Sequence, residues 1–309
     1  MGTMRLVVAC LMMFGLQPPD LVGQTPRGDG ESAASQAGAS RAERLQKERD
    51  NLELQKIPPF KAFDNLYYVG VGWVGSWLVT TNQGLILIDT LEDPYVDRLL
   101  DNIKTVGFDP RDIKYVLVTH AHNDHVGGAA RIQEAYGPKV AMVEGDWKLL
   151  EGIGGAAPKA RAPRRDLVVR DGDTLTLGST TLRLYAHPGH TPGGLSIEFT
   201  VYDGGKPYQA FVFPGAAPGQ GLQAAEQFLA SVNRLEQLQE RVQVRVVTHA
   251  WMDPAFWDRV DALAERRPGG QHPFVAPEVF RAWIRELKAA GTKRLEDDRA
   301  KAASPSPRH

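Results

Sequence analysis

The stretch Thr119-His120-Ala121-His122-Asn123-Asp124-His125-Val126-Gly127-Gly128 holds four metal-ligand side chains within six positions, directly after an apolar run typical of a strand. His120 and His122 can converge on one ion, while Asp124 and His125 face a second ion beside it. A single His or Asp would be an ordinary loop residue, but three of the eight histidines of the 309-residue chain lie here. The stretch therefore predicts a dinuclear metal site.

The first ion needs a third protein ligand, and two histidines near one strand end are candidates. His190 lies in the turn Gly189-His190-Thr191-Pro192-Gly193-Gly194, and His187 lies three positions earlier. We favour His190 because its proline and glycine neighbours define a rigid turn, which is a better platform for a preorganised ligand.

The second ion would be held by Asp124, His125 and a third group, for which His249 is the first candidate. His249 ends the apolar run 244–248, so a strand would place it rigidly. The competitor, His272, lies in a Gly- and Pro-containing loop and is expected to be a solvated loop residue.

Asp89 closes the apolar run 85–89 and is a candidate partner for a metal-bound imidazole, which usually donates its second N–H to a carboxylate. The alternative is a turn-forming aspartate. Four aromatic residues nearby could line a pocket mouth, but aromatics at strand spacing are more often core, and we expect core packing for Tyr67, Tyr68, Trp73 and Trp77.

The composition fits a globular protein that acts on a small-molecule substrate. The hydrophobic fraction of 42% is enough for a sizeable core. A formal net charge of −1 offers no general attraction for nucleic acid or anionic lipid, which argues against a nuclease. The sequence indicates no particular oligomeric state.

The N-terminus resembles a secretory signal peptide spanning residues 1–23. A positive charge at Arg5 precedes the apolar stretch 6–16, and small residues lie near Gly23. The stretch is too short for a membrane span, which needs about 20 residues. The alternative is an apolar N-terminal strand. We expect a periplasmic or secreted protein.

Cys10 is the only cysteine and lies inside this leader. The mature chain would have no thiolate, so every metal ligand must be His, Asp or Glu. Lipidation is not expected, because the apolar stretch continues past Cys10.

The remaining chain divides into a flexible linker with a short N-terminal helix (24–57), a folded domain (58–300) and a disordered tail (301–309). Within the domain, Asp93 is expected to cap a helix that starts at Pro94 and ends at Gly107. Strands are expected at 66–81, 85–89, 113–118, 174–177, 181–186, 196–201, 208–213 and 242–248, and further helices at 126–136, 222–238, 254–266 and 277–290. Two halves, each with strands followed by a helix, predict an α/β fold of face-to-face sheets with helices outside.

The chain resembles the metallo-β-lactamase superfamily. The residues that carry the resemblance are 119–128, the turn 189–194 and His249. The resemblance covers about Pro58 to Lys288 and implies an αβ/βα four-layer sandwich with a dizinc site along one edge. It is strongest to the cysteine-free third subclass of secreted zinc β-lactamases, which the stretches 211–221 and 272–275 also resemble. That subclass binds one zinc with three His and the other with Asp-His-His.

One stretch departs from the patterns of the superfamily. Residues 213–219 read Phe-Pro-Gly-Ala-Ala-Pro-Gly and contain no acid, whereas many superfamily hydrolases, glyoxalase II among them, carry a metal-bridging Asp here. A glyoxalase function is therefore disfavoured. Ala216 and Ala217 also stand where the third subclass usually offers a serine, which bears on how a β-lactam would be positioned.

The resemblance implies a zinc-dependent hydrolase with two zinc ions per chain that opens the β-lactam amide and confers β-lactam resistance. A bridging hydroxide would be the nucleophile, and Asp124 would hold and orient it. A related dizinc hydrolase of a lactone or thioester is the alternative. A purely structural zinc protein is disfavoured, because six ligands on two ions leave coordination positions open to water.

The signal-peptide hypothesis predicts export with cleavage near Gly23. Mass spectrometry of the protein isolated from its native compartment should find a chain that begins close to residue 24. Soluble cytoplasmic protein with an intact Met1 would contradict the prediction.

Overall fold

The computed structural model describes residues 40–153 and 161–303. The expected signal peptide and residues 24–39 of the expected linker lie outside the described residues. Residues 40–57, in contrast, are part of the domain. Helix α1 (Arg41–Lys47) starts at a capping box between Ser40 and Glu43, and its Ala42 and Leu45 are buried against the core.

The first sheet has seven strands in chain order. Its strands are β1 (Phe60–Phe63), β2 (Leu66–Tyr68), β3 (Trp77–Thr81), β4 (Gly84–Ile88), β5 (Ile113–Leu117), β6 (Lys139–Val143) and β7 (Leu167–Val169). The strands from β1 to β4 pair antiparallel, and those from β4 to β7 pair parallel. Parallel strands need crossover connections, which helices provide here.

The second sheet has the order β12-β11-β10-β9-β8. Its strands are β8 (Thr174–Leu177), β9 (Thr180–Ala186), β10 (Leu195–Asp203), β11 (Lys206–Val212) and β12 (Val244–Val246). All pairs are antiparallel except β11 with β12. The parallel pair is joined through helix α6 (Leu222–Leu235).

The two sheets pack face to face around a shared core. In β4, Ile86 and Ile88 belong to the core that contains Leu184 and Ile197 of the second sheet. Leu85 and Leu87 point to the opposite face, as the two-residue period of a strand requires, and pack in a second core. Strand β4 is therefore covered on both faces, which explains its continuous apolar sequence.

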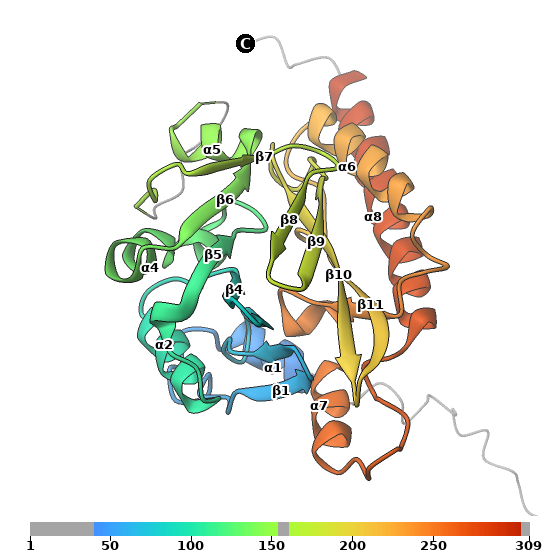
Figure 1. The fold of residues 1–309 in the computed structure, drawn as a ribbon. Coiled ribbons are helices and arrows are strands. Elements are labelled where there is room, and N and C mark those ends of the chain that lie inside the picture. The colour runs from blue at the N-terminus through green and yellow to red at the C-terminus, as the bar shows by residue number, and fades with distance from the viewer. Residues whose placement is uncertain (1–39, 154–160, 304–309) are drawn as a thin grey trace, which may run out of the picture. The chain divides into compact units, whose positions relative to one another are not determined.

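Helices cover the outer face of each sheet (Figure 1). On the first sheet these are α2 (Val96–Thr105), α4 (Ala129–Tyr136) and α5 (Glu144–Leu150). On the second sheet, α6 packs against α8 (Pro277–Ala303), and ring contacts such as Phe211 with Phe280 at 5.7 Å join helix to strand. The remaining helices are α3 (Asn123–Val126), α7 (Phe256–Ala264) and the 3₁₀ turns η1 (Pro110–Asp112) and η2 (Ala250–Met252). The predicted αβ/βα four-layer sandwich is confirmed.

Several element boundaries differ from the sequence-based expectations. The run 66–81 is interrupted by a turn, in which Val71 donates to the carbonyl of Val74. Asp93 caps no helix, because α2 begins later, at Val96. The helix expected at 126–136 starts later, as α4 at Ala129, and the shorter helix α3 precedes it; Gly128 separates the two because its N–H bonds the carbonyl of Leu91. Helix α8 continues to Ala303, past the expected start of the tail.

The apolar run 139–143 and the residues after it form β6 and α5, which the sequence analysis did not anticipate. Strands β1 and β7 were also missed. Among the described residues, no helix is both long and apolar enough to cross a membrane.

Trp77 joins the two sheets and supplies a test of the packing. Its side chain is 2% exposed, contacts Tyr68 edge to face at 5.0 Å, and donates from Nε1 to the carbonyl of Val247 at 2.8 Å. Trp77→Ala should lower the free energy of unfolding by about 3–5 kcal/mol, measured by urea denaturation. Tyr202→Ala, at a 40% exposed position, should cost less than about 1 kcal/mol. Equal losses in both variants would contradict this assignment.

Candidate metal centre

The predicted ligand residues lie immediately after the ends of three strands. His120 and His122 follow β5, and helix α3 then carries Asp124 and His125. His190 lies in the turn between β9 and β10, and His249 follows β12. A ligand placed at a strand end is held by the sheet behind it, so the three segments meet with little freedom.

The structure brings His120, His122 and His190 together as one triad. One ligand atom from each lies within 4.8 Å of the others. The ring centroids are 4.7 Å apart for His120 with His122, 4.7 Å for His120 with His190, and 4.8 Å for His122 with His190. All three pairs are inclined at 78°, so the rings meet edge to face around a common point. We call this group the three-histidine triad.

Asp124, His125 and His249 form a second group, the Asp-His-His triad. Oδ2 of Asp124 is 3.3 Å from Nε2 of His125 and 3.3 Å from Nε2 of His249. The two Nε2 atoms are 3.1 Å apart. The triads are adjacent, since the rings of His120 and His125 have centroids only 4.0 Å apart.

The second ring nitrogen of each of four imidazoles is held by a hydrogen bond. Nδ1 of His125 donates to Asp89 at 2.8 Å, Nδ1 of His249 to the carbonyl of Trp73 at 3.1 Å, and Nδ1 of His190 to the carbonyl of Ala217 at 2.6 Å. Nδ1 of His120 is 3.1 Å from the Thr119 hydroxyl, which itself donates to Asp89 and so accepts from the imidazole. These bonds place the proton on Nδ1 and leave Nε2 as the ligand atom.

The donor set fits a divalent metal. In the Asp-His-His triad, two neutral imidazoles would direct their Nε2 lone pairs at each other across 3.1 Å, beside a carboxylate oxygen. Such an arrangement needs either a proton or a metal ion between the two nitrogens. Imidazole and carboxylate ligands without thiolate, three to an ion, suit zinc and leave positions open for water.

The electrostatics of the two triads differ. Burial lowers the pKa of His120 well below its usual value, and the nearby imidazoles lower it further. Burial likewise lowers the pKa of His122. Burial and the neighbouring His122 together lower the pKa of His190 to about 4, although the hydrogen bond to Ala217 opposes the shift. All three are therefore neutral at pH 7, which is the metal-binding form of imidazole.

The Asp-His-His triad attracts positive charge instead. Burial opposes the charge of His125, but Asp124 and Asp89 outweigh it and raise the pKa to about 10. Burial would also raise the pKa of Asp124, but the charge and hydrogen bonds of His125 and His249 lower it well below the usual range. A metal bound here would displace the shared proton.

The competing histidines lie elsewhere. Nδ1 of His187 is 2.7 Å from the Ser196 hydroxyl, and its ring stacks on Tyr185. Nε2 of His272 bonds the carbonyl of Ala62 at 2.8 Å, and its ring stacks on Phe63 at 4.0 Å. His272 is 4% exposed, so the expectation that it is a solvated loop residue was wrong. It packs against β1, a strand that the sequence analysis missed.

The aromatic residues expected in the core are found there. Tyr68, Trp73 and Trp77 are buried, and Tyr67 is half-buried against Phe108. Trp73 also reaches the site through its backbone, as the acceptor for His249.

The sequence analysis missed Asp146, in the first turn of α5. Its carboxylate accepts from Gly194 N at 2.9 Å, Thr191 Oγ1 at 3.1 Å and Gly193 N at 3.2 Å. Burial raises the pKa of Asp146 to about 6 although these donors oppose the shift. The strand-like run 139–143 followed by a Glu-Gly-Asp sequence was the signal for a strand-to-helix junction here.

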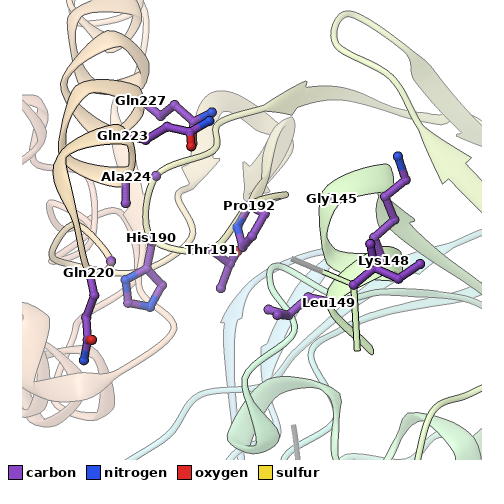
Figure 2. Close-up of a pocket in the computed structure, with 13 residues that line it drawn as sticks. Gly145, Lys148, Leu149, His190, Thr191, Pro192, Gln220, Gln223, Ala224 and Gln227 are labelled. Carbon is purple, nitrogen blue, oxygen red and sulfur yellow. The ribbon is translucent and has the colours of Figure 1, made fainter. Parts of the chain in front are cut away.

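A cleft of about 490 Å³ opens beside His190 (Figure 2). Gln220 and two residues of α6, Gln223 and Gln227, lie on one side of it, and Lys148 and Leu149 of α5 lie on the other. The cleft is large enough for a small molecule whose reacting bond lies at the triads.

Comparison with known proteins places the chain in a family. The profile of the metallo-β-lactamase superfamily matches residues 70–203. Among curated proteins, the hydroxyacylglutathione hydrolase of Acidiphilium cryptum is 36% identical over 124 residues, 40% of this chain and 44% of that protein. The corresponding enzyme of Pseudomonas putida strain W619 is 33% identical over 135 residues, 42% of this chain and 45% of that protein. The chain thus spans less than half the length of these relatives.

Solved structures match over a much larger part of the chain. A subclass B3 metallo-β-lactamase of Bradyrhizobium japonicum is 30% identical with a TM-score of 0.71, covering 80% of this chain and 96% of that one. The native metallo-β-lactamase of Legionella gormanii is 28% identical with a TM-score of 0.70, covering 79% of this chain and 98% of that one. The chain belongs to the metallo-β-lactamase superfamily, as its motifs indicated, and its fold is similar to that of the subclass B3 enzymes.

Proposed function

We propose that this hydrolase of the metallo-β-lactamase superfamily binds two zinc ions and opens the amide of a β-lactam. The observation that carries the proposal is the thiolate-free pair of triads, three histidines beside Asp-His-His, on a chain that aligns with nearly the whole of a subclass B3 enzyme. The similarity to hydroxyacylglutathione hydrolases covers a smaller part of those proteins.

The segment after β11 favours an amide substrate over a thioester. It supports the site through a backbone carbonyl, that of Ala217, and not through an acidic side chain. Gly215 lies against the ring of His190 at a positive φ of 80°, and a Cβ there would collide with the imidazole. The segment is therefore built to hold His190 and supplies no bridging carboxylate of the glyoxalase II kind.

Bound zinc would lower the pKa of a coordinated water to about 7 and polarise the scissile carbonyl. The protein residues supply the binding and orientation. His120, His122 and His190 would hold one ion, and Asp124, His125 and His249 the other. The Asp124 carboxylate, kept anionic by its neighbours, can accept a hydrogen bond from the attacking water and orient it.

The cleft would hold the part of the substrate that extends past His190. The amides of Gln220, Gln223 and Gln227 offer both donors and acceptors, and Lys148 offers a positive charge for a substrate carboxylate. A second candidate function, hydrolysis of a thioester, is favoured by the curated relatives and would use the same triads.

The first prediction of this proposal concerns zinc stoichiometry. Metal analysis should find two zinc ions per chain, and His190→Ala should reduce this to one because it removes a ligand of the three-histidine triad. His187→Ala, at a nearby histidine that contacts Ser196 instead, should retain both ions. Loss of an ion from the His187 variant but not from the His190 variant would show that the ligand assignment is wrong.

The second prediction concerns the substrate. Zinc-loaded protein should hydrolyse at least one member of a panel of a penicillin, a cephalosporin and a carbapenem, lose this activity on chelation, and regain it with zinc. Asp124→Ala should lower kcat by about 100-fold or more because it removes the orienting carboxylate. Asp101→Ala, at an exposed position of α2, should retain activity.

A lactone and a glutathione thioester belong in the same panel. Turnover of one of these, with every β-lactam ignored, would leave the metal centre in place and reject the β-lactam assignment.

A further inference from the structure

Asp146 is a buried carboxylate that belongs to neither of the two triads. It is 1% exposed and lies between two turns. One is the turn that carries His190, whose Thr191, Gly193 and Gly194 donate hydrogen bonds to the carboxylate. The other is the turn between His120 and His122, where the backbone of Ala121 lies close enough to the carboxylate to help lower its pKa. A single carboxylate therefore touches both turns that supply the three-histidine triad.

Close contacts fix the start of α5, which carries Asp146, against the His190 turn. A Cβ on Gly193 would lie 2.5 Å from Cγ of Asp146, and a Cβ on Gly145 would collide with the carbonyl of Pro192. The start of α5 thus packs backbone against backbone on the His190 turn, with Thr191 and Pro192 between His190 and α5 (Figure 2). The two glycines permit the approach, and the carboxylate satisfies the N–H groups that this approach buries.

The two triads differ in which groups bond their imidazoles from outside. Asp89 bonds an imidazole of the Asp-His-His triad directly, at His125. In the three-histidine triad, His120 meets a hydroxyl and His190 a backbone carbonyl. The separation of the two histidine-bearing turns is therefore set by what joins their backbones.

We propose that Asp146 is a positioning residue for the three-histidine triad, which sets the distance between the His120–His122 turn and His190 before metal binds. The proposal rests on the metal-binding function proposed above. Groups that orient metal ligands from outside typically contribute 10- to 100-fold to metal affinity, so the effect on zinc binding should be large enough to measure.

The test measures zinc affinity at this triad alone. The parent for the test is full-length protein carrying His249→Ala, which removes one ligand of the Asp-His-His triad and leaves the three-histidine triad complete. The zinc Kd of the three-histidine triad can then be measured by competition with a chromophoric chelator. Adding Asp146→Asn should raise this Kd about 10- to 100-fold, because the amide cannot accept from every N–H that the carboxylate serves. Thr191→Val, which removes one hydroxyl donor, should raise it about fivefold and covers the case in which the asparagine variant fails to fold.

Glu198→Gln is the matched control. Glu198 of β10 is also a buried carboxylate, 6% exposed, but its partners are Tyr185 of β9 and Arg241, which lies between α6 and β12. Glu198→Gln should change the zinc Kd by less than about threefold, because distant sites act independently. This should hold even if Glu198→Gln lowers the free energy of unfolding as much as Asp146→Asn does.

A second readout separates positioning from general destabilisation. At saturating substrate, excess zinc should restore the activity of Asp146→Asn toward that of the parent, whereas any deficit of Glu198→Gln should not respond to zinc. Unchanged zinc affinity in folded Asp146→Asn, or equal weakening by Glu198→Gln, would overturn the positioning role. Absence of zinc binding in the His249→Ala parent would instead reject the metal centre itself.

Discussion

The Asp89 carboxylate is the contact on which both triads depend. One oxygen accepts from the backbone N–H of Thr119 at 2.7 Å, and the other accepts from the Thr119 hydroxyl and from His125, each at 2.8 Å. It thereby fixes the entry to the His120 turn and the orientation of a ligand in the neighbouring triad. Asp89 holds a positive φ of 61°, which costs a non-glycine residue about 1–3 kcal/mol and persists because β5 and Ser76 bond its backbone.

Much of the site could be predicted from sequence because its chemistry is local. Four candidate ligands lie within six positions after a strand. The rigid turn around His190 and the strand end before His249 distinguish these two residues from the other histidines. The same reasoning failed for His272, whose Gly- and Pro-containing loop suggested exposure. Its burial depends on β1, more than 200 residues away in the sequence, and no local pattern reports such a contact.

Some of the missed contacts are made by backbone groups, which carry no residue-type signal. The carbonyls of Trp73 and Ala217 orient His249 and His190, but any residue could supply a carbonyl. Asp146 was missed because its role depends on the junction of β6 and α5, and that junction was not recognised. The four-layer fold was predictable because it follows from the order of strand and helix patterns, which can be recognised without exact boundaries. The boundaries themselves depend on tertiary hydrogen bonds, such as the one from Gly128 to Leu91.

Under the proposed function, the segment after β11 would distinguish between substrates without any change in the metal ligands. Here it contributes a carbonyl to His190 and methyl side chains at 216 and 217, so it can neither bridge two ions nor donate a hydroxyl to substrate. The polar side chains of the cleft include Gln220 at the end of this segment, Gln223 and Gln227 of α6, and Lys148 of α5. Lys148 lies 3.7 Å from Glu144, which also pairs with Arg165. Under the proposed function, a substrate with both an anionic group and an amide would pair with this lysine and these glutamines better than an uncharged ester would.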